Sequence, residues 1–185
     1  MSLEDRIAAL EHKLQDLTDR QEILDCIVRT ARGNDRFDLE RIVGSYHADG
    51  IHELGRNLIS GTAYGDHANH AHGAMCEANL HNVTMHSCEI EGNVAHAESY
   101  VIGMFLDKGC ETSRLIAGRY LDRLEKRDGR WGIVVRRVTA EIPLEGVARL
   151  PNRKTVPGSG YLKGSRGKDD PSYERPLTTN GGERW

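Results

Sequence analysis

Residues 81–142 read HNVTMHSCEIEGNVAHAESYVIGMFLDKGCETSRLIAGRYLDRLEKRDGRWGIVVRRVTAEI, and this stretch decides the fold. It divides into four segments in which apolar residues alternate with polar ones or β-branched and aromatic residues accumulate: 81–90, 94–106, 112–125 and 131–142. Both patterns are typical of β-strands. Short turns separate the segments, and Asp128-Gly129 in the last turn is a strong hairpin signal. Four successive strands joined by short turns predict an antiparallel meander.

Helices are predicted upstream of the meander. Thr18 followed by Gln21 resembles a capping box, so we expect a first helix to break near Thr18 and a second to run over about 19–30. The first helix carries five apolar residues at alternating intervals of four and three: Leu3, Ile7, Leu10, Leu14 and Leu17. This spacing would also suit a coiled coil, but two heptads are few. We therefore favour packing of this helix against its own sheet or against a neighbouring subunit.

The remaining N-terminal elements are shorter. The sequence predicts a helix over about 37–46, short strands over 51–54 and 57–60, and a further helix over about 63–79. Helices that precede a run of strands indicate the α+β class.

The composition changes at about residue 151. Four of the five prolines lie in 151–185, together with few aliphatic residues. Such a segment cannot build a core of its own. We expect a main domain over 1–150 and a Pro/Gly-rich C-terminal arm over 151–185, which is either flexible or ordered against a neighbouring subunit or the mouth of the pocket.

Charge and cysteine content exclude several classes of protein. The net charge of −3 argues against binding to nucleic acid or to an acidic membrane surface. No run of about 20 apolar residues occurs, and the charged N-terminus lacks the apolar segment of a signal peptide. None of the four cysteines forms a CxxC pair. We therefore expect a cytoplasmic protein with reduced thiols.

Three residues stand out as candidates for chemistry. Asp35 lies at the bend between two predicted helices, His81 begins the alternating segment, and Arg136 lies on the last strand. Each also has an ordinary structural interpretation: a helix cap, a core histidine and a strand charge. The residue types alone leave both interpretations open.

Several stretches resemble the SnoaL-like branch of the nuclear transport factor 2-like superfamily over about residues 3–142. The resemblance rests on His81 and on three segments: LEDRIAALE (3–11), RGNDRFDLERIVGSYHADG (32–50) and GRYLDRLEKRDGRWGIVVRRV (118–138). It implies a cone-shaped curved antiparallel sheet closed by N-terminal helices around one pocket.

Within that superfamily the chain is most similar to lyases that use a His–Asp dyad, such as hexachlorocyclohexane dehydrochlorinase, scytalone dehydratase and bile-acid 7α-dehydratase. The resemblance implies that Asp35 and His81 form the dyad and that Arg136 matches the arginine on the last strand of the dehydrochlorinase. The implied function is a lyase (dehydratase or dehydrohalogenase type) or isomerase that needs no cofactor. It would act on a hydrophobic cyclic small molecule by general-base catalysis.

The chain departs from the family pattern where a general acid would be expected. Val28 or Thr30 occupies the place of a tyrosine that many relatives carry, and the second catalytic aspartate of the bile-acid enzyme falls near Gly103. Tyr46, Tyr100 and Tyr120 are the candidates for contacts to the substrate or leaving group.

The histidines of GDHANHAHG (65–73) raise the question of a metal site. His67 and His70 would share a helix face, but zinc would need further ligands such as His52 or Glu53. We favour a solvated helix and expect no metal and no cofactor.

Two other functions stay open. The same fold could serve as a non-catalytic small-molecule binding module, or as a structural subunit like the small subunit of ring-hydroxylating dioxygenases. Contact between Asp35 and His81 inside a pocket would favour the enzyme. Apolar strand faces and the arm's isolated aromatics lead us to expect a homo-oligomer, a trimer before a dimer.

Overall fold

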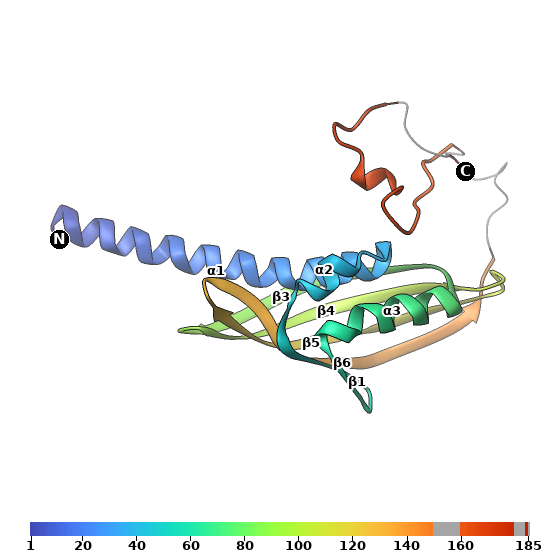
Figure 1. Cartoon of the computed structure of the whole chain (residues 1–185), viewed down its shortest axis with the longest axis horizontal. Coiled ribbons are helices and arrows are strands. Elements are labelled where there is room, and N and C mark those ends of the chain that lie inside the picture. Colours follow the sequence, from blue (N-terminus) through green and yellow to red (C-terminus); the bar gives the residue numbers. More distant parts are fainter. Residues whose placement is uncertain (150–159, 180–183, 185) are drawn as a thin grey trace.

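The computed structural model describes residues 1–149, 160–179 and 184. Three helices and a six-stranded sheet make up the main body (Figure 1). The helices are α1 (Leu3–Arg36), α2 (Leu39–Val43) and α3 (Gly61–Met75). The strands are β1 (Tyr46–Leu54), β2 (Asn57–Ser60), β3 (Cys76–Glu91), β4 (Val94–Asp107), β5 (Thr112–Arg127) and β6 (Arg130–Val147).

Helix α1 is continuous, so the predicted break near Thr18 is wrong. The Thr18 hydroxyl donates to the carbonyl of Leu14, 2.8 Å away, instead of capping a new helix. A threonine can bond in this way inside a helix without ending it. At the N-terminus the Ser2 and Asp5 side chains form a reciprocal capping box. The helix ends where Phe37 adopts a left-handed backbone with φ of 53°.

The other boundaries shift by a few residues. Helix α2 is shorter than predicted because Asp38 caps it and Gly44 ends it. Helix α3 starts behind Ser60, whose hydroxyl accepts from the amide of Ala63, and it ends at Met75. Strand β3 therefore begins at Cys76, five residues before the predicted start of the meander.

The sheet has the order β2-β1-β6-β5-β4-β3. Strands β3 to β6 form the predicted antiparallel meander. Strand β1 pairs parallel to β6, with His52 beside Arg136, so the sheet is mixed and does not close on itself. The α+β class and the cone-like architecture are confirmed, with this one parallel pair as the difference.

All three helices contribute to one core against the concave side of the sheet (Figure 1). Ile23 and Ile27 of α1 and Ile42 of α2 are fully buried. They pack with alternate residues of the strands, among them Ala95 and Leu124. None of the helices in the described part of the chain combines the length and hydropathy needed to span a membrane.

The described part of the arm, residues 160–179, lies against its own chain near the C-terminal end of α1 (Figure 1). Arg32 donates to the Tyr173 hydroxyl at 3.1 Å, and the Tyr173 hydroxyl also bonds Asp38. Arg36 pairs with the buried Asp170 at 3.4 Å. The division at residue 150 falls among residues outside the description, so the domain boundary stays a prediction.

Asp19 fixes α1 to the sheet. Its carboxylate accepts from the indole N–H of Trp131 at 2.8 Å and from Lys126 Nζ at 2.7 Å. Burial favours the neutral acid, but the hydrogen bonds from Lys126 and Trp131 outweigh it and lower the pKa of Asp19. Trp131 is itself almost fully buried.

We expect Asp19→Ala to lower the free energy of unfolding by about 1–3 kcal/mol, because the buried indole N–H loses its acceptor. Urea unfolding followed by tryptophan fluorescence would measure this loss. Asp16→Ala is the matched control: Asp16 makes only an exposed ion pair with Arg20, which contributes less than about 1 kcal/mol. Equal losses in the two variants would contradict the assignment.

Candidate active site

The site is built around Asp35 in the last turn of α1. The carboxylate is buried, and the turn of chain behind it is closed by the bond from the Asp38 amide to the carbonyl of Gly33. Strand β3 passes this end of the helix and presents His81. A helix end and a strand remote in sequence thus meet at one carboxylate.

Asp35 and His81 form a close pair. Asp35 Oδ1 lies 2.7 Å from His81 Nδ1, and Asp35 Oδ2 accepts from the His81 backbone amide at 3.0 Å. Each side chain is about 10% exposed. The predicted contact between these two residues is confirmed. Because Nδ1 faces a carboxylate, it carries the ring proton, and the neutral imidazole keeps Nε2 free to accept one.

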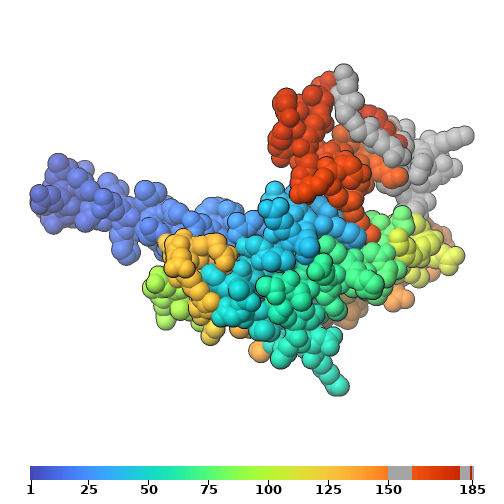
Figure 2. Space-filling model, viewed as in Figure 1, coloured from blue at the N-terminus to red at the C-terminus, as the bar shows by residue number. Residues whose placement is uncertain are grey.

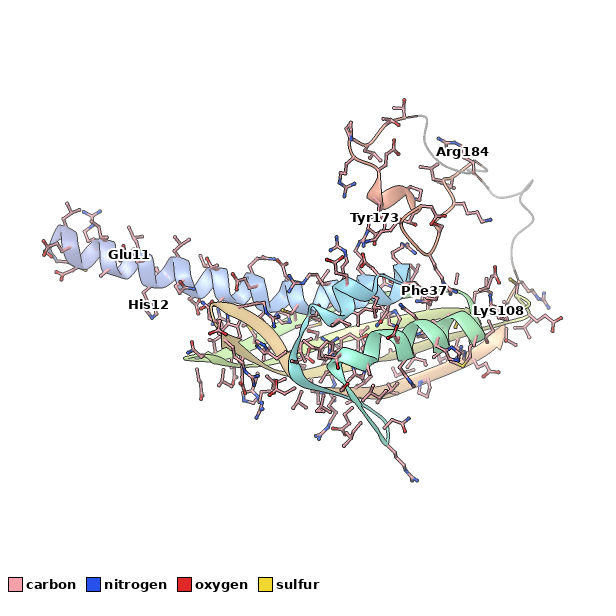
Figure 3. The ribbon with its side chains drawn as sticks, in the orientation of Figure 1. Glu11, His12, Phe37, Lys108, Tyr173 and Arg184 are labelled. Atoms are coloured by element: carbon pink, nitrogen blue, oxygen red, sulfur yellow. The ribbon has the colours of Figure 1, made fainter. Side chains whose placement is uncertain are left out.

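Asn79 connects the Asp35–His81 pair to the C-terminal arm through hydrogen bonds. Its amide donates to Asp35 Oδ1 at 3.1 Å and to the carbonyl of Asn34 at 3.2 Å. Its own oxygen accepts from Arg166 at 2.8 Å. Arg166 also bonds the carbonyl of Cys76 and lies over the ring of Phe37, 4.7 Å from its centroid. Figure 3 labels Phe37 and Tyr173, two of the residues at this junction between the body and the arm.

A second histidine lies beside the first. The His72 ring of α3 lies 5.4 Å from that of His81, and Phe105 contacts both rings at 5.8 and 5.5 Å. His72 Nδ1 is buried without a hydrogen-bond partner among the described residues. Burial first, and then the neighbouring His81, lower the pKa of His72 to about 4. His72 is therefore neutral at pH 7, and the expectation that all three α3 histidines are solvated is wrong for this one.

The ring of Phe105 occupies the space beside Gly103. A Cβ added to Gly103 would lie 2.7 Å from the edge of this ring. The position that carries a second aspartate in the family pattern is therefore filled by an apolar ring. The general acid expected from that aspartate has no counterpart here.

Arg136 is fully buried in the same interior but belongs to a second cluster. Its guanidinium bonds both oxygens of Asp122, at 2.7 and 2.8 Å, and lies 4.2 Å from the centroid of Tyr120. Burial opposes its charge, but the attraction of Asp122 outweighs burial and raises the pKa of Arg136. One nitrogen, Nη1, is buried without a partner among the described residues. Arg136 thus has one nitrogen, Nη1, left to donate to another group.

The three candidate tyrosines are placed differently. The Tyr46 hydroxyl lies 2.7 Å from His52 Nδ1, and both residues are buried. Tyr120 is buried under Arg136, and burial raises the pKa of its hydroxyl, which also feels the charge of Asp35. Tyr100 is 44% exposed on the outer face of the sheet. Alternation along β4 turns its neighbours Ser99 and Val101 inward instead, so the structure does not bring Tyr100 to the Asp35–His81 pair, and its contact with a substrate stays a prediction.

An apolar hollow on the outer face of the sheet does not include His81. This hollow of about 550 Å³ is lined by outer-face side chains such as Leu80, Met104 and Leu144. Leu80 and His81 are neighbours in β3 and therefore face opposite sides of the sheet. His67 and His70 are exposed on α3, and the described residues contain no group of three or more His, Cys, Asp or Glu side chains arranged to hold a metal ion.

Sequence reasoning missed His72, Asn79 and Arg166. A signal for His72 exists, because it continues the buried stripe Gly61, Tyr64, Gly65 and Ala68 at helical spacing. Asn79 was hidden by the prediction that α3 continues to residue 79. Arg166 lies in a segment without periodicity, and no local pattern connects it to β3.

The low pKa of His72 gives a pH dependence of stability. Between about pH 4 and 6.5 the folded state binds fewer protons than the unfolded state. The contribution of neutral His72 is therefore complete above pH 6.5 and is lost as the pH falls to about 4, at a slope of at most about 1.4 kcal/mol per pH unit. We expect His72→Gln to flatten this slope in urea unfolding measured across the range. His67→Gln, on the exposed face of the same helix, should keep the wild-type slope; identical slopes in both variants would count against the assignment.

Comparison with known proteins places this arrangement in a family. The family model for the SnoaL-like domain matches residues 15–137. The crystal structure of LinA is similar at 21% identity and a TM-score of 0.70, covering 76% of this chain and 99% of LinA. The hexachlorocyclohexane dehydrochlorinase LinA-type3 from Novosphingobium barchaimii LL02 gives 22% identity and a TM-score of 0.66, with coverage of 76% and 99%. A candidate scytalone dehydratase from Novosphingobium aromaticivorans gives 16% identity and a TM-score of 0.63, with coverage of 74% and 93%.

These likenesses to solved structures show a shared fold. A comparison with curated proteins finds no match. The family model spans well over half of the chain. The chain therefore belongs to the SnoaL-like domain family.

Proposed function

We propose that this chain is a lyase or isomerase that removes a proton from a carbon atom of a hydrophobic cyclic small molecule, with His81 as the general base and with no cofactor. The observation that carries the proposal is the Asp35–His81 pair, in which one carboxylate holds both the ring and the backbone amide of the histidine. The names of the neighbouring dehydrochlorinase and dehydratase structures agree with this reaction class.

His81 suits the role of base because its tautomer is fixed. Asp35 Oδ1 accepts from Nδ1, which leaves Nε2 as the basic atom. When Nε2 takes a proton, the imidazolium lies against a carboxylate at 2.7 Å, which stabilises the new charge. The low exposure of both side chains strengthens this attraction.

In an elimination, His81 Nε2 takes the proton from the carbon next to the leaving group. The electron pair of that C–H bond becomes the new carbon–carbon double bond, and the leaving group departs with the pair of its own bond. A halide leaves as the anion, whereas a hydroxyl leaves as water when His81 Nε2 passes it the proton taken from carbon, which returns the imidazole to its neutral form. In an isomerisation the proton returns from His81 to another carbon of the same molecule.

The surroundings of the dyad favour an apolar substrate. Phe105 and His72 contact the His81 ring, and the buried residues Val101 and Tyr120 belong to the adjoining core. We assign the free Nη1 of Arg136 and the Tyr120 hydroxyl as candidate donors to the departing group or to a carbonyl oxygen of the substrate. Tyr46 would act indirectly, by positioning His52 through their hydrogen bond.

His81→Ala and Asp35→Asn should each lower turnover by about 10²–10⁴-fold, and the double variant should lose little more than either single one, because the two residues act as a unit. The assay would follow enone formation from cyclic β-hydroxy ketones by ultraviolet absorbance, and chloride release from hexachlorocyclohexane. Circular dichroism would confirm that the variants fold. Small additive losses would contradict a shared role.

Binding and turnover measured on the same proteins distinguish an enzyme from a non-catalytic binding module. Wild-type protein that binds these compounds in calorimetry but converts none of them would overturn the enzymatic proposal. The structural-subunit alternative predicts a larger partner that copurifies with the chain, and neither turnover nor binding of the cyclic compounds.

Arg166 should act as a positioning residue, since it holds Asn79, which in turn holds Asp35. We expect Arg166→Ala to lower kcat by roughly tenfold and to shift the pH profile of kcat, with a smaller change in KM. Arg175→Ala is the matched control from the same arm, because Arg175 bonds only its neighbour's carbonyl among the described residues. A wild-type pH profile in R166A would remove Arg166 from the site.

A further inference from the structure

The N-terminal part of α1 projects beyond the body of the protein. Figure 2 shows this end of the helix standing clear of the rest of the chain. The apolar stripe that the sequence pattern defines is exposed there. Of the two expected alternatives, packing on its own sheet is therefore wrong, and packing against a neighbouring subunit stays open. Its members and their exposed fractions are Leu3 69%, Ile7 47%, Leu10 65%, Leu14 66% and Leu17 64%.

The stripe follows a heptad repeat, in which Ile7 and Leu14 take position a and Leu3, Leu10 and Leu17 take position d. Further along the helix the same register places Gln21 at a, Leu24 at d and Val28, 44% exposed, at a. The repeat therefore continues past the point where α1 reaches the sheet, with one polar residue, Gln21, in the seam.

The body lies on the opposite side of the helix. In the same register His12, Asp19 and Cys26 occupy position f, which faces away from an a/d seam. Asp19 and Cys26 are buried against the sheet through Trp131. In Figure 3 the side chain of His12 points from the helix to the side on which the sheet lies. A partner helix on the seam would therefore not collide with the body.

The charges beside the seam are complementary for two parallel copies. Position g carries Arg6, Lys13 and Arg20, and position e carries Glu4, Glu11, Thr18 and Asp25. In a parallel pair, each g residue faces the e residue five positions further on in the partner, so Arg6 faces the second copy's Glu11. Arg6 and Arg20 therefore have acidic counterparts, whereas Lys13 has Thr18 as its counterpart. In an antiparallel pair, g faces g and e faces e, which would bring like charges together. None of the ion pairs among the described residues uses Arg6 or Glu11.

We propose that the N-terminal stripe of α1 is a dimerisation surface that binds the same stripe of a second copy of this chain as a parallel two-stranded coiled coil. Leucine occupies every d position, and the β-branched residues Ile7 and Val28 at a favour two strands over three, whereas Leu14 at a adds nothing to this preference. This proposal assigns a specific interface to the expected homo-oligomer and favours a dimer over the trimer that we expected first.

The short seam suffices because its helix is already formed. An isolated helix of this length would be marginal in water, since nucleation is costly. Here residues 19–36 are held by the body, and the projecting turns only extend an existing helix. Mixed charges on the flanks, rather than a lysine-rich polar face, disfavour a membrane surface as the occupant.

The dimer leaves the candidate active site open. Asp35 lies 18 residues beyond Leu17 along the same helix, a distance of about 27 Å at 1.5 Å per residue. Association at one end of α1 and chemistry at the other can therefore be tested separately.

Cysteine cross-linking tests the seam directly. In a parallel pair, equivalent d residues lie side by side, so Leu10→Cys should form an intermolecular disulfide under mild oxidation. His12→Cys, two residues away at f, should give only the wild-type background of the four natural thiols. Equal cross-linking of both variants, or of neither, would overturn the proposal.

Charge exchange tests the orientation and the occupant. R6E alone and E11R alone should each weaken self-association by at least about tenfold, and an equimolar mixture should restore it, as measured by sedimentation velocity at micromolar concentration. Wild-type protein that sediments as a monomer, or a mixture that fails to recover, would show that another occupant covers the stripe. A cross-linked species of three chains would overturn the two-stranded arrangement.

Discussion

The carboxylate of Asp35 joins the two halves of this molecule. It lies in the last turn of α1 and binds the backbone and ring of His81, while Asn79 bonds it from the same strand. The two elements come from positions more than forty residues apart, so the contact fixes how the helical layer sits on β3. Removing the carboxylate group would leave a strand amide and a ring N–H without acceptors in a buried place. The same hydrogen bonds that position the helix thus orient the histidine.

The interior is unusually polar for a core that packs well. Arg136 and Asp122 form a fully buried pair, and Tyr46, His52 and Tyr64 form a second cluster in which the last two rings stack at 3.6 Å. Buried ion pairs contribute little net stability, because desolvation offsets their attraction. Apolar residues would serve stability equally well at these positions. Their presence beside the dyad is more readily explained by a need to bind and polarise a small molecule.

The sequence was informative where the pattern is periodic. Alternation and hairpin turns predicted the meander β3 to β6, and the heptad spacing predicted the helical start of α1. The sequence was misleading at Thr18, which matches a helix cap in pattern but donates to the carbonyl of Leu14 inside a continuous helix. The parallel pairing of β1 with β6 has no local signature, since it depends on residues far apart. For the site, the resemblance supplied Asp35 and His81, whereas Arg166 could be found only once the chain was folded.

The parallel pair in the sheet has a consequence for how the chain reaches its fold. His52 of β1 lies beside Arg136 of β6, a separation of about eighty residues, and contacts of such high sequence separation slow folding. The hairpin of β1 and β2 cannot join the sheet until β6 has formed, although β3, β4 and β5 can pair locally as they emerge from the ribosome. During that interval one edge of β1 and one edge of β5 are unpaired. Strand edges of this kind are where partly folded chains associate, so the late docking of β6 is the step at which this protein is most exposed to aggregation.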